Sequence, residues 1–297
     1  MAKFSDLELF NSIVRSNSLV GAGRELGITG AAVSKRLMAL EARLGVRLIQ
    51  RTTRTLRITP EGERYVQEGK RLLSELDELE QTLRGATARP AGLLRVNASL
   101  GFGRAFVSTI LGEFAALYPE LEVQLHLSDR PLNLVDAGFD IGIWVGQLPD
   151  VRLHARKLRN NRRVICATPD YLKKHGIPGS ISDLSRHSVI VLHENEQTFG
   201  IWQLHNDTRH ETLKVRARMS TNDGEIALSW ALSGYGLILR SQWSVQKLIN
   251  EGKLCRVLSD WYEPADVYAV YPTQEQLSAK TRAFIDFIAQ HPLTGAE

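Results

Sequence analysis

The sequence predicts an α+β multidomain protein: an N-terminal winged helix-turn-helix, a long linker helix, and a C-terminal part of two α/β lobes. Three observations support this. The first sixty residues are basic and show helical periodicity, the next segment carries a leucine seam, and the remainder alternates short apolar strands with helices. With 297 residues, the chain is long enough for two or three folding units. The expected divisions are 1–59 for the winged helix-turn-helix, 60–84 for the linker helix, 85–92 for a hinge, and 93–297 for the two lobes.

The composition, 43% hydrophobic and 24% charged, is typical of a globular protein. No run of about 18 apolar residues occurs, and the N-terminus has no apolar h-region, so we expect neither a membrane span nor a secretory signal. The chain has two cysteines, Cys166 and Cys255. That number excludes a secreted disulfide scaffold and favours a reducing cytoplasm.

Charge is unevenly distributed along the chain. Residues 1–60 hold ten Lys/Arg and four Asp/Glu, a net charge of +6, whereas the whole chain carries +4. A basic first fifth attached to a near-neutral remainder indicates a module that binds a polyanion. A solvated basic face is the alternative.

Two helices are predicted at the N-terminus. Ser5 and Glu8 have the spacing of a capping box, and Asn17 ends this first helix. Ser18 is the expected cap of a second, shorter helix that stops at Gly27. Two glycines inside the second helix each cost about 1 kcal/mol relative to alanine. They indicate that another helix approaches closely.

A third helix follows the turn and fits the major groove of DNA. Thr29 is its cap, and Thr29, Gly30 and Ala31 form a small-residue N-terminal end, which allows close approach to a surface and has N–H groups that favour phosphate. The core-facing stripe is Val33, Leu37, Leu40 and Leu44. The opposite face contains Ala31, Ser34, Lys35 and Met38, with Arg36 on the flank. A turn between two such helices predicts a helix-turn-helix.

The periodicity changes after Gly45. Residues 47–50 and 56–58 alternate as in a β-hairpin, with RTTRT between them. Arg51, Thr53 and Arg54 are therefore candidate contacts to phosphates or a minor groove.

Residues 60–84 are predicted to form one helix, started by Thr59 and Pro60. A helix with one narrow leucine seam usually pairs with another helix, and packing on its own chain is the alternative. The seam consists of Tyr65, Gly69, Leu72, Leu76, Leu79 and Leu83.

The C-terminal residues are predicted to form α/β units with mainly parallel strands. The number of predicted strands suggests two small sheets and not one, with a ligand cleft between them. Strands are expected at 93–98, 123–127, 141–145, 164–167, 189–192, 215–219, 237–239, 254–258 and 267–271, and helices at 103–118, 225–233, 243–250 and 274–290.

The segment 99–104 follows the first of these strands and approaches the GxGxxG pattern. It lacks the third glycine and a suitable acid, which argues against a dinucleotide site. The Ser99 hydroxyl and the N–H groups of the helix start remain as a pocket for an anion such as a carboxylate. A tight turn without a ligand is the alternative.

No catalytic, metal or cofactor pattern is evident, because HExxH, GxSxG, CxxC and P-loop spacings are absent. His205 and His210 lie in a polar stretch that is typical of an exposed loop. Cys166 and Cys255 have apolar, strand-like neighbours, so we expect inert buried thiols. A redox switch formed by this pair is the competing hypothesis.

The chain resembles the LysR-type transcriptional regulators over essentially its whole length. The most specific part, AAVSKRLMALEARLGVRLIQRTTRTLRITPEGE (31–63), is similar to the family's AVS…LE..LG..LF.R…..LT..G signature. The resemblance implies a winged helix-turn-helix, a dimerising linker helix and a two-lobed effector domain like periplasmic binding proteins. Further similar segments are 106–123, 134–146, 168–178, 220–243 and 252–261.

The resemblance also implies site residues. Gly30 stands where the family often has Gln, which removes one possible base contact. Trp144 stands where relatives commonly have Arg, so one cation for an acidic effector is missing if that position lines the cleft. The implied DNA contacts are Thr29, Ala31, Ser34, Lys35, Arg36, Arg51, Thr53 and Arg54. The implied effector contacts are Ser99, Leu100, Ser128, Phe199, Gly200, Trp202, Asn222 and Arg240.

We therefore expect a non-enzymatic, cytoplasmic regulator of transcription that binds specific DNA and is controlled by a small organic acid held between two lobes. Its expected partners are double-stranded DNA, a carboxylate effector, further copies of the chain (a homodimer through the linker helix, then a homotetramer) and RNA polymerase, with no membrane. A cytoplasmic solute-binding protein or enzyme with a basic appendage is the alternative.

Overall fold

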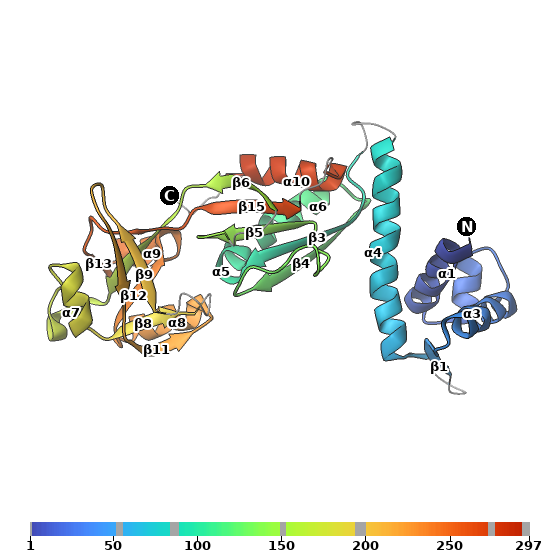
Figure 1. Ribbon diagram of the computed structural model, residues 1–297, viewed down its shortest axis with the longest axis horizontal. Helices are drawn as coiled ribbons and strands as arrows, with labels where there is room; N and C mark the ends of the chain where they lie inside the picture. Colours follow the sequence, from blue (N-terminus) through green and yellow to red (C-terminus); the bar gives the residue numbers. More distant parts are fainter. Residues whose placement is uncertain are drawn as a thin grey trace. The chain divides into compact units, whose positions relative to one another are not determined.

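The computed structural model describes residues 2–51, 56–83, 89–148, 153–193, 200–272 and 277–292. It divides into two compact units, Met1–Ala88 and Arg89–Glu297 (Figure 1).

The N-terminal unit is a three-helix core followed by a two-stranded wing and a long helix. Its elements are α1 (Ala2–Ser16), α2 (Leu19–Glu25), α3 (Gly30–Leu44), β1 (Ile49–Arg51), β2 (Leu56–Ile58) and α4 (Pro60–Leu83). The core is formed by Leu9, Phe10, Ile13, Ala22, Val33, Leu37, Leu40, Leu48 and Ile49. Ser18 and Thr29 cap α2 and α3, as expected, by accepting the N–H groups of Gly21 and Ala32. Helix α1 begins at Ala2, so Ser5 lies inside the helix and not at its cap.

The buried stripe of α3 differs from the prediction in its last turn. Leu44 is 36% exposed, whereas Glu41 is only 6% exposed. The Glu41 carboxylate accepts hydrogen bonds from the N–H groups of Leu48 (2.8 Å) and Ile49 (3.1 Å). In this turn the buried position is Glu41 and not the expected Leu44. Its burial follows from the two N–H groups at the start of β1, which need a buried acceptor.

Helix α4 packs against α1 with the first part of its seam. A Cβ atom on Gly69 would lie 2.7 Å from Leu7 Cδ2, and the Tyr65 ring packs edge-on to Phe10 at 5.5 Å between centroids. At Tyr65 and Gly69 the seam therefore packs on its own chain, which was the alternative to pairing with another helix. Leu72, the next seam residue, is 40% exposed. The side chains of Leu79 and Leu83 lie outside the described residues.

Lobe I of the C-terminal unit is a five-stranded sheet with helices on one face (Figure 1). Its elements are β3 (Gly92–Ser99), α5 (Leu100–Phe102), a π-helical turn η1 (Gly103–Val107), α6 (Ser108–Leu117), β4 (Leu121–Ser128), β5 (Ile141–Val145), β6 (Leu153–Arg159), β15 (Val267–Pro272) and α10 (Ala279–Gln290). The strand order is β4-β3-β5-β15-β6. Phe114 of α6 and Phe284 of α10 meet in the core on this face, at 5.2 Å between ring centroids.

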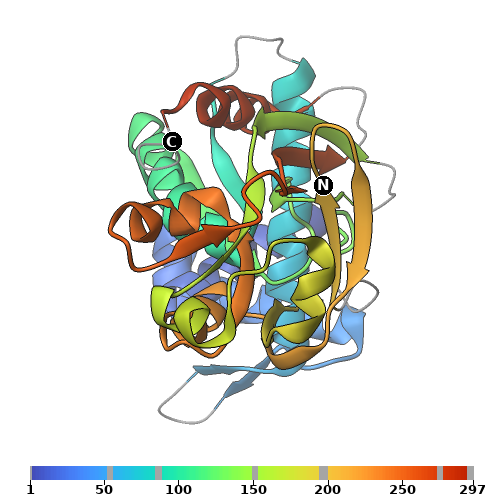
Figure 2. The same ribbon diagram turned by 90° about the vertical axis from the view of Figure 1, so that its left-hand side faces the viewer.

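Lobe II has a second sheet, of order β11-β8-β12-β7-β13, with β14 beside β7. Its elements are β7 (Arg162–Ala167), α7 (Pro169–His175), the 3-10 helix η2 (Ile181–Arg186), β8 (Val189–Leu192), β9 (Ile201–His205), β10 (His210–Lys214), β11 (Ala217–Thr221), α8 (Gly224–Leu232), β12 (Leu237–Ser241), α9 (Gln242–Asn250), β13 (Cys255–Val257) and β14 (Glu263–Pro264). Strands β9 and β10 form a separate two-stranded ribbon (Figures 1 and 2).

Both sheets are mixed, and the expectation of mainly parallel sheets is wrong. Strand β3 is parallel to β4 and β5, but β15 is antiparallel to β5 and β6. Strand β8 is parallel to β11 and β12, but β7 is antiparallel to β12. The cause is the topology: the chain enters lobe II through β6–β7 and returns through β14–β15, so each lobe gains a strand of opposite direction.

The two crossings between the lobes are hydrogen-bonded to each other. The Ala265 N–H donates to the Asn161 carbonyl at 3.0 Å, and the Asn161 side-chain amide donates to the Ala265 carbonyl at 2.8 Å. The Asn161 N–H also donates to Asp266 Oδ1 at 3.0 Å. The lobes are thus joined at one narrow double crossing, where a hinge is physically possible.

One continuous helical stretch, Leu100–Leu117, is long and apolar enough to cross a membrane by length and composition alone. In the fold it is the core helix of lobe I. Phe102, Val107, Ile110 and Phe114 bury their side chains against the sheet, which accounts for the apolar composition.

Candidate nucleic-acid interface and effector site

Helices α2 and α3 approach each other closely at their glycines. A Cβ atom on Gly23 would lie 2.6 Å from the Ile28 carbonyl oxygen, and one on Gly30 would lie 3.2 Å from Val20 Cγ2. The expected close approach is confirmed at Gly23, which lies against the turn and the start of α3, whereas a Cβ atom on Gly21 would meet Ser16 and Ser18 instead of α3.

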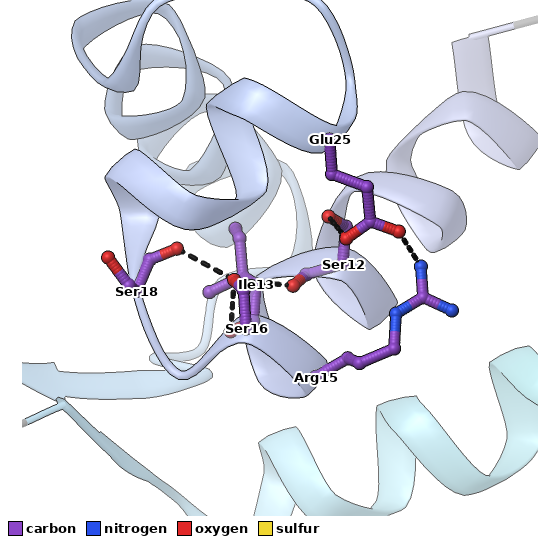
Figure 3. A network of polar contacts seen from close by, with 6 residues as sticks. All are labelled: Ser12, Ile13, Arg15, Ser16, Ser18 and Glu25. Carbon is purple, nitrogen blue, oxygen red and sulfur yellow. Dashed lines mark hydrogen bonds and ion pairs between the residues drawn. The ribbon is translucent and has the colours of Figure 1, made fainter.

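A polar network fixes α1 against α2 (Figure 3). The Ser12 hydroxyl, in a residue only 1% exposed, donates to Glu25 at 2.7 Å, and Arg15 pairs with the same carboxylate. The Ser16 hydroxyl bonds to the carbonyls of Ser12 and Ser18, both at 2.8 Å. Because α2 carries α3, this network also helps to orient α3.

The outward side of α3 presents the predicted DNA-contact residues. Ala31 and Lys35 are exposed and Ser34 is half-buried. The exposed Thr29 accepts the Ala32 N–H at 3.2 Å, so its hydroxyl acts as the helix cap. Arg36 lies 3.7 Å from the Asp6 carboxylate, which places its guanidinium on the α1 flank of the helix.

The wing is tied to α3 at its base. Besides the two N–H groups of β1, Glu41 holds Arg47 at 3.0 Å. Thr59 donates to the Arg47 carbonyl at 2.7 Å and caps α4 by accepting the Gly62 N–H at 3.0 Å. Arg51 lies in β1, whereas Thr53 and Arg54 lie outside the described residues. Glu41 was not singled out from the sequence. Its position, four residues after the core residue Leu37, places it on the buried side of α3 and could have indicated a buried acid.

Strand ends of lobe I face lobe II at three points. The Asn222 amide, after β11, donates to Asp129 Oδ2, after β4, at 2.7 Å. Gln147, after β5, bonds to Gln203 of β9. A Cβ atom on Gly101, after β3, would lie 3.6 Å from Trp243, after β12. The carboxyl ends of the parallel strands of both sheets thus converge, which is where α/β sheets bind ligands.

Polar side chains gather at this end of lobe I. Ser99 and Ser128 are register partners on β3 and β4. Buried Asn97 donates to Ser128 Oγ at 3.0 Å and accepts the Trp144 indole N–H at 2.9 Å. Ser99 Oγ accepts the Val145 N–H at 3.3 Å, and Leu100 starts the following helix. The structure therefore brings Ser99, Leu100 and Ser128 together.

Two further candidates are packed into lobe II. Trp202 is 5% exposed and its ring belongs to the lobe II core. Arg240 is 6% exposed, 3.7 Å from Glu225, and a Cβ atom on Gly224 would lie 2.6 Å from its Nη2. Gly200 is buried in a left-handed conformation (φ 68°), and Phe199 lies outside the described residues. Asn222 lies between the lobes.

An ion pair joins the two lobes, and a second lies within lobe II, between β7 and β14. Arg104 lies 3.7 Å from Asp223, the cap of α8, and Arg163 bonds to Glu263 at 2.8 Å. Burial opposes ionisation of Asp223, but N–H donors from Ile226 and Glu225, together with Arg104, outweigh it and hold its pKa below the ordinary value. Trp144 is 2% exposed among Leu134 and Val270, so that position adds no cation.

The cysteine pair cannot form a disulfide in this fold. Cys255 is the register partner of Ala167, so it lies on the sheet face opposite to Cys166. Burial raises the pKa of the Cys166 thiol to about 12, which keeps it protonated and inert. His205 and His210 are cross-strand partners with ring centroids 4.5 Å apart. Within the described residues, no three potential ligands cluster around a metal position.

A basic winged helix-turn-helix joined to a two-lobed α/β unit defines the class of ligand-responsive DNA-binding regulators. Comparison with known families agrees. Residues 4–63 match the bacterial regulatory helix-turn-helix protein, lysR family, and residues 87–292 match the LysR substrate binding domain. The chain belongs to the LysR family of transcriptional regulators, and it has that family's DNA-binding and effector-binding domains.

Similar proteins cover nearly the full length. The HTH-type transcriptional regulator DmlR of Escherichia coli (strain K12) is 39% identical over 97% of this chain and 94% of its own. The HTH-type transcriptional activator TtdR of the same strain is 37% identical over 96% and 92%. Among solved structures, full-length AphB, a virulence activator of Vibrio cholerae, is 27% identical (TM-score 0.60, 97% and 98% covered). CrgA of Neisseria meningitidis is 30% identical (TM-score 0.59, 96% and 97% covered).

Proposed function

We propose that this regulator reads duplex DNA with the outward side of α3 and the wing, and that a small organic acid bound between the lobes controls it. The exposed Lys35 on a helix whose other side is core supports the first part. The DNA contacts are Thr29, Ala31, Ser34, Lys35, Arg36, Arg51, Thr53 and Arg54.

The convergence of strand ends carries the second part. Ser99, Ser128 and Asn222 sit on facing strand ends, and the N–H groups at the start of the Leu100 helix are donors for a carboxylate. The ligand would compete with the Asn222–Asp129 contact and bias the hinge, which shifts the population of lobe arrangements. Trp202 and Arg240 contribute as supporting residues from lobe II, together with Phe199 and Gly200.

The DNA contact is tested by binding of full-length protein to duplexes selected from a random pool, as a function of salt. We expect Lys35→Ala to weaken binding and to reduce the salt slope by about 1, because one phosphate or base contact is lost. Lys173→Ala, an exposed lysine of α7, is the matched control with an unchanged slope. Equal slopes for both variants would contradict the assignment.

The effector site is tested by thermal unfolding of the full chain with small carboxylates and their matched amides. A true ligand at 100 times its Kd adds about 2.7 kcal/mol by mass action. We expect carboxylates alone to raise Tm, and Ser128→Ala to reduce the shift. Shifts from amides of equal size, or none from any carboxylate, would refute the organic-acid assignment.

The proposed assembly is a homodimer through α4, and dimers pair into a homotetramer that contacts RNA polymerase in the cytoplasm. Exposed Leu72 beyond the α1 contact supports the helix pairing. Sedimentation of Leu72→Glu should show a lighter species, whereas Ile177→Glu, at a residue 73% exposed in lobe II, should not. We assign no enzymatic activity to the chain.

A further inference from the structure

The outward side of α3 has few hydrogen-bonding groups. All residues of α3 are described, and five exposed ones are apolar; four of these lie on the outward side around Lys35, whereas Leu44 lies on the opposite side of the helix. We call these four the apolar face of α3: Ala31, Met38, Ala39 and Ala42. Met38 is the largest of them and is 50% exposed. Within this face only Lys35 offers a charged group, and half-buried Ser34 lies on its edge.

A further exposed apolar residue lies on α2, next to the start of α3. Val20 is 58% exposed, and its Cγ2 lies 3.2 Å from the Cβ position of Gly30 at the start of α3. Helix α3 therefore presents methyl and thioether groups over at least two turns. The core of this unit uses the opposite side of the helix, so nothing in the core requires these residues to be apolar.

The surroundings of the face indicate which partner covers it. The first sixty residues carry a net charge of +6, and Lys35 projects from the middle of the face. A protein surface with a matching apolar patch would not need this charge, whereas duplex DNA does. The only apolar group that a base pair presents in the major groove is the C5-methyl of thymine.

Resting on the proposed DNA contact of α3, we propose that Met38 is a specificity-determining residue that packs on a thymine methyl group, with Ala31 adding a smaller contact. Lys35 supplies the hydrogen bonds, and Met38 discriminates thymine from the other bases by apolar contact. The operator half-site therefore contains a thymine opposite the third turn of α3, where Met38 lies.

The test replaces single thymines by deoxyuridine, which removes the methyl group and leaves base pairing intact. The operator is first selected from a random duplex pool with the full-length protein. Burying one methyl group contributes about 0.8 kcal/mol, so the parent should lose about fourfold in affinity at the contacted thymine. Met38→Ala should bind the thymine operator more weakly and show no further loss on the deoxyuridine operator.

Leu44→Ala is the matched control, because Leu44 is a partly exposed apolar residue at the other end of α3. It should keep the fourfold ratio between the two operators, and Met38→Leu should retain most of it. Circular dichroism and Tm should show that Met38→Ala is folded.

Three results would overturn the inference. Equal affinity of the parent for thymine and deoxyuridine at every position removes the methyl contact. An unchanged ratio in Met38→Ala assigns the contact to another residue. A change in sedimentation of Met38→Ala at an unchanged ratio makes the face a contact between copies. If Lys35→Ala reduces the salt slope by about 1 but no deoxyuridine substitution changes the affinity of the parent, the general DNA contact of α3 stands and the thymine contact of Met38 does not.

Discussion

Replacing Glu41 by alanine should loosen the wing from α3. The carboxylate is 6% exposed and accepts the N–H groups of Leu48 and Ile49, both in buried residues. Each donor left without an acceptor costs about 1–3 kcal/mol. The Arg47 partner is 76% exposed, so that ion pair adds only about 0–1 kcal/mol. Water entry recovers part of the loss, and we expect about 2–4 kcal/mol for the local opening of the hairpin.

Amide hydrogen exchange of the full-length protein measures this opening directly. A loss of 2–4 kcal/mol corresponds to a decrease of about 30- to 1,000-fold in protection of the Leu48 and Ile49 amides. Glu41→Gln keeps an acceptor oxygen for both donors and should cost about 1 kcal/mol. The alanine variant should also bind operator DNA more weakly, because the wing is no longer positioned. Protection equal to that of the parent in Glu41→Ala would refute the reasoning.

Three further predictions follow from the contacts. Gly23→Ala places a Cβ 2.6 Å from the Ile28 carbonyl oxygen, so it should destabilise the N-terminal unit by about 1–3 kcal/mol in thermal unfolding; an unchanged Tm would contradict this. Native Cys166 should resist iodoacetamide at pH 8, because burial raises its pKa to about 12; rapid mass-spectrometric labelling would count against the burial. The pKa of Asp223 is lowered in the folded protein. Its contribution to stability is therefore complete above the ordinary pKa of an aspartate, about 4, and is lost as the pH falls through the lowered pKa. Asp223→Asn should therefore flatten the acid limb of Tm against pH, and superimposed limbs would exclude that role.

The sequence predicted the elements whose pattern is local. Helix α3 was recognisable from Thr29, Gly45 and its apolar spacing, and β5 and β8 from short apolar runs. Strand β6 was missed because its side chains are mostly exposed, so no apolar run marks it. The direction of β7 and β15 was also missed, because it depends on how the chain crosses between lobes and not on local composition.

Burial of polar residues was harder to foresee. Glu41 is buried because donors from another segment meet it, and Asn97 because Ser128 and Trp144 surround it. Arg240 was predicted as an effector contact. In the fold its guanidinium packs against Gly224 at the start of α8, a contact that local sequence does not reveal. Such placements arise from tertiary contacts, which residue spacing does not encode.

The most direct test of the central claim is methylation interference on the selected operator. Methylation of guanine N7 blocks the major groove at that base. If the outward side of α3 lies in that groove, modified guanines in each half-site should prevent binding of the parent, and Lys35→Ala should lose interference at one of them. Binding that tolerates N7 methylation throughout the operator, or an interference pattern identical in Lys35→Ala, would contradict the account.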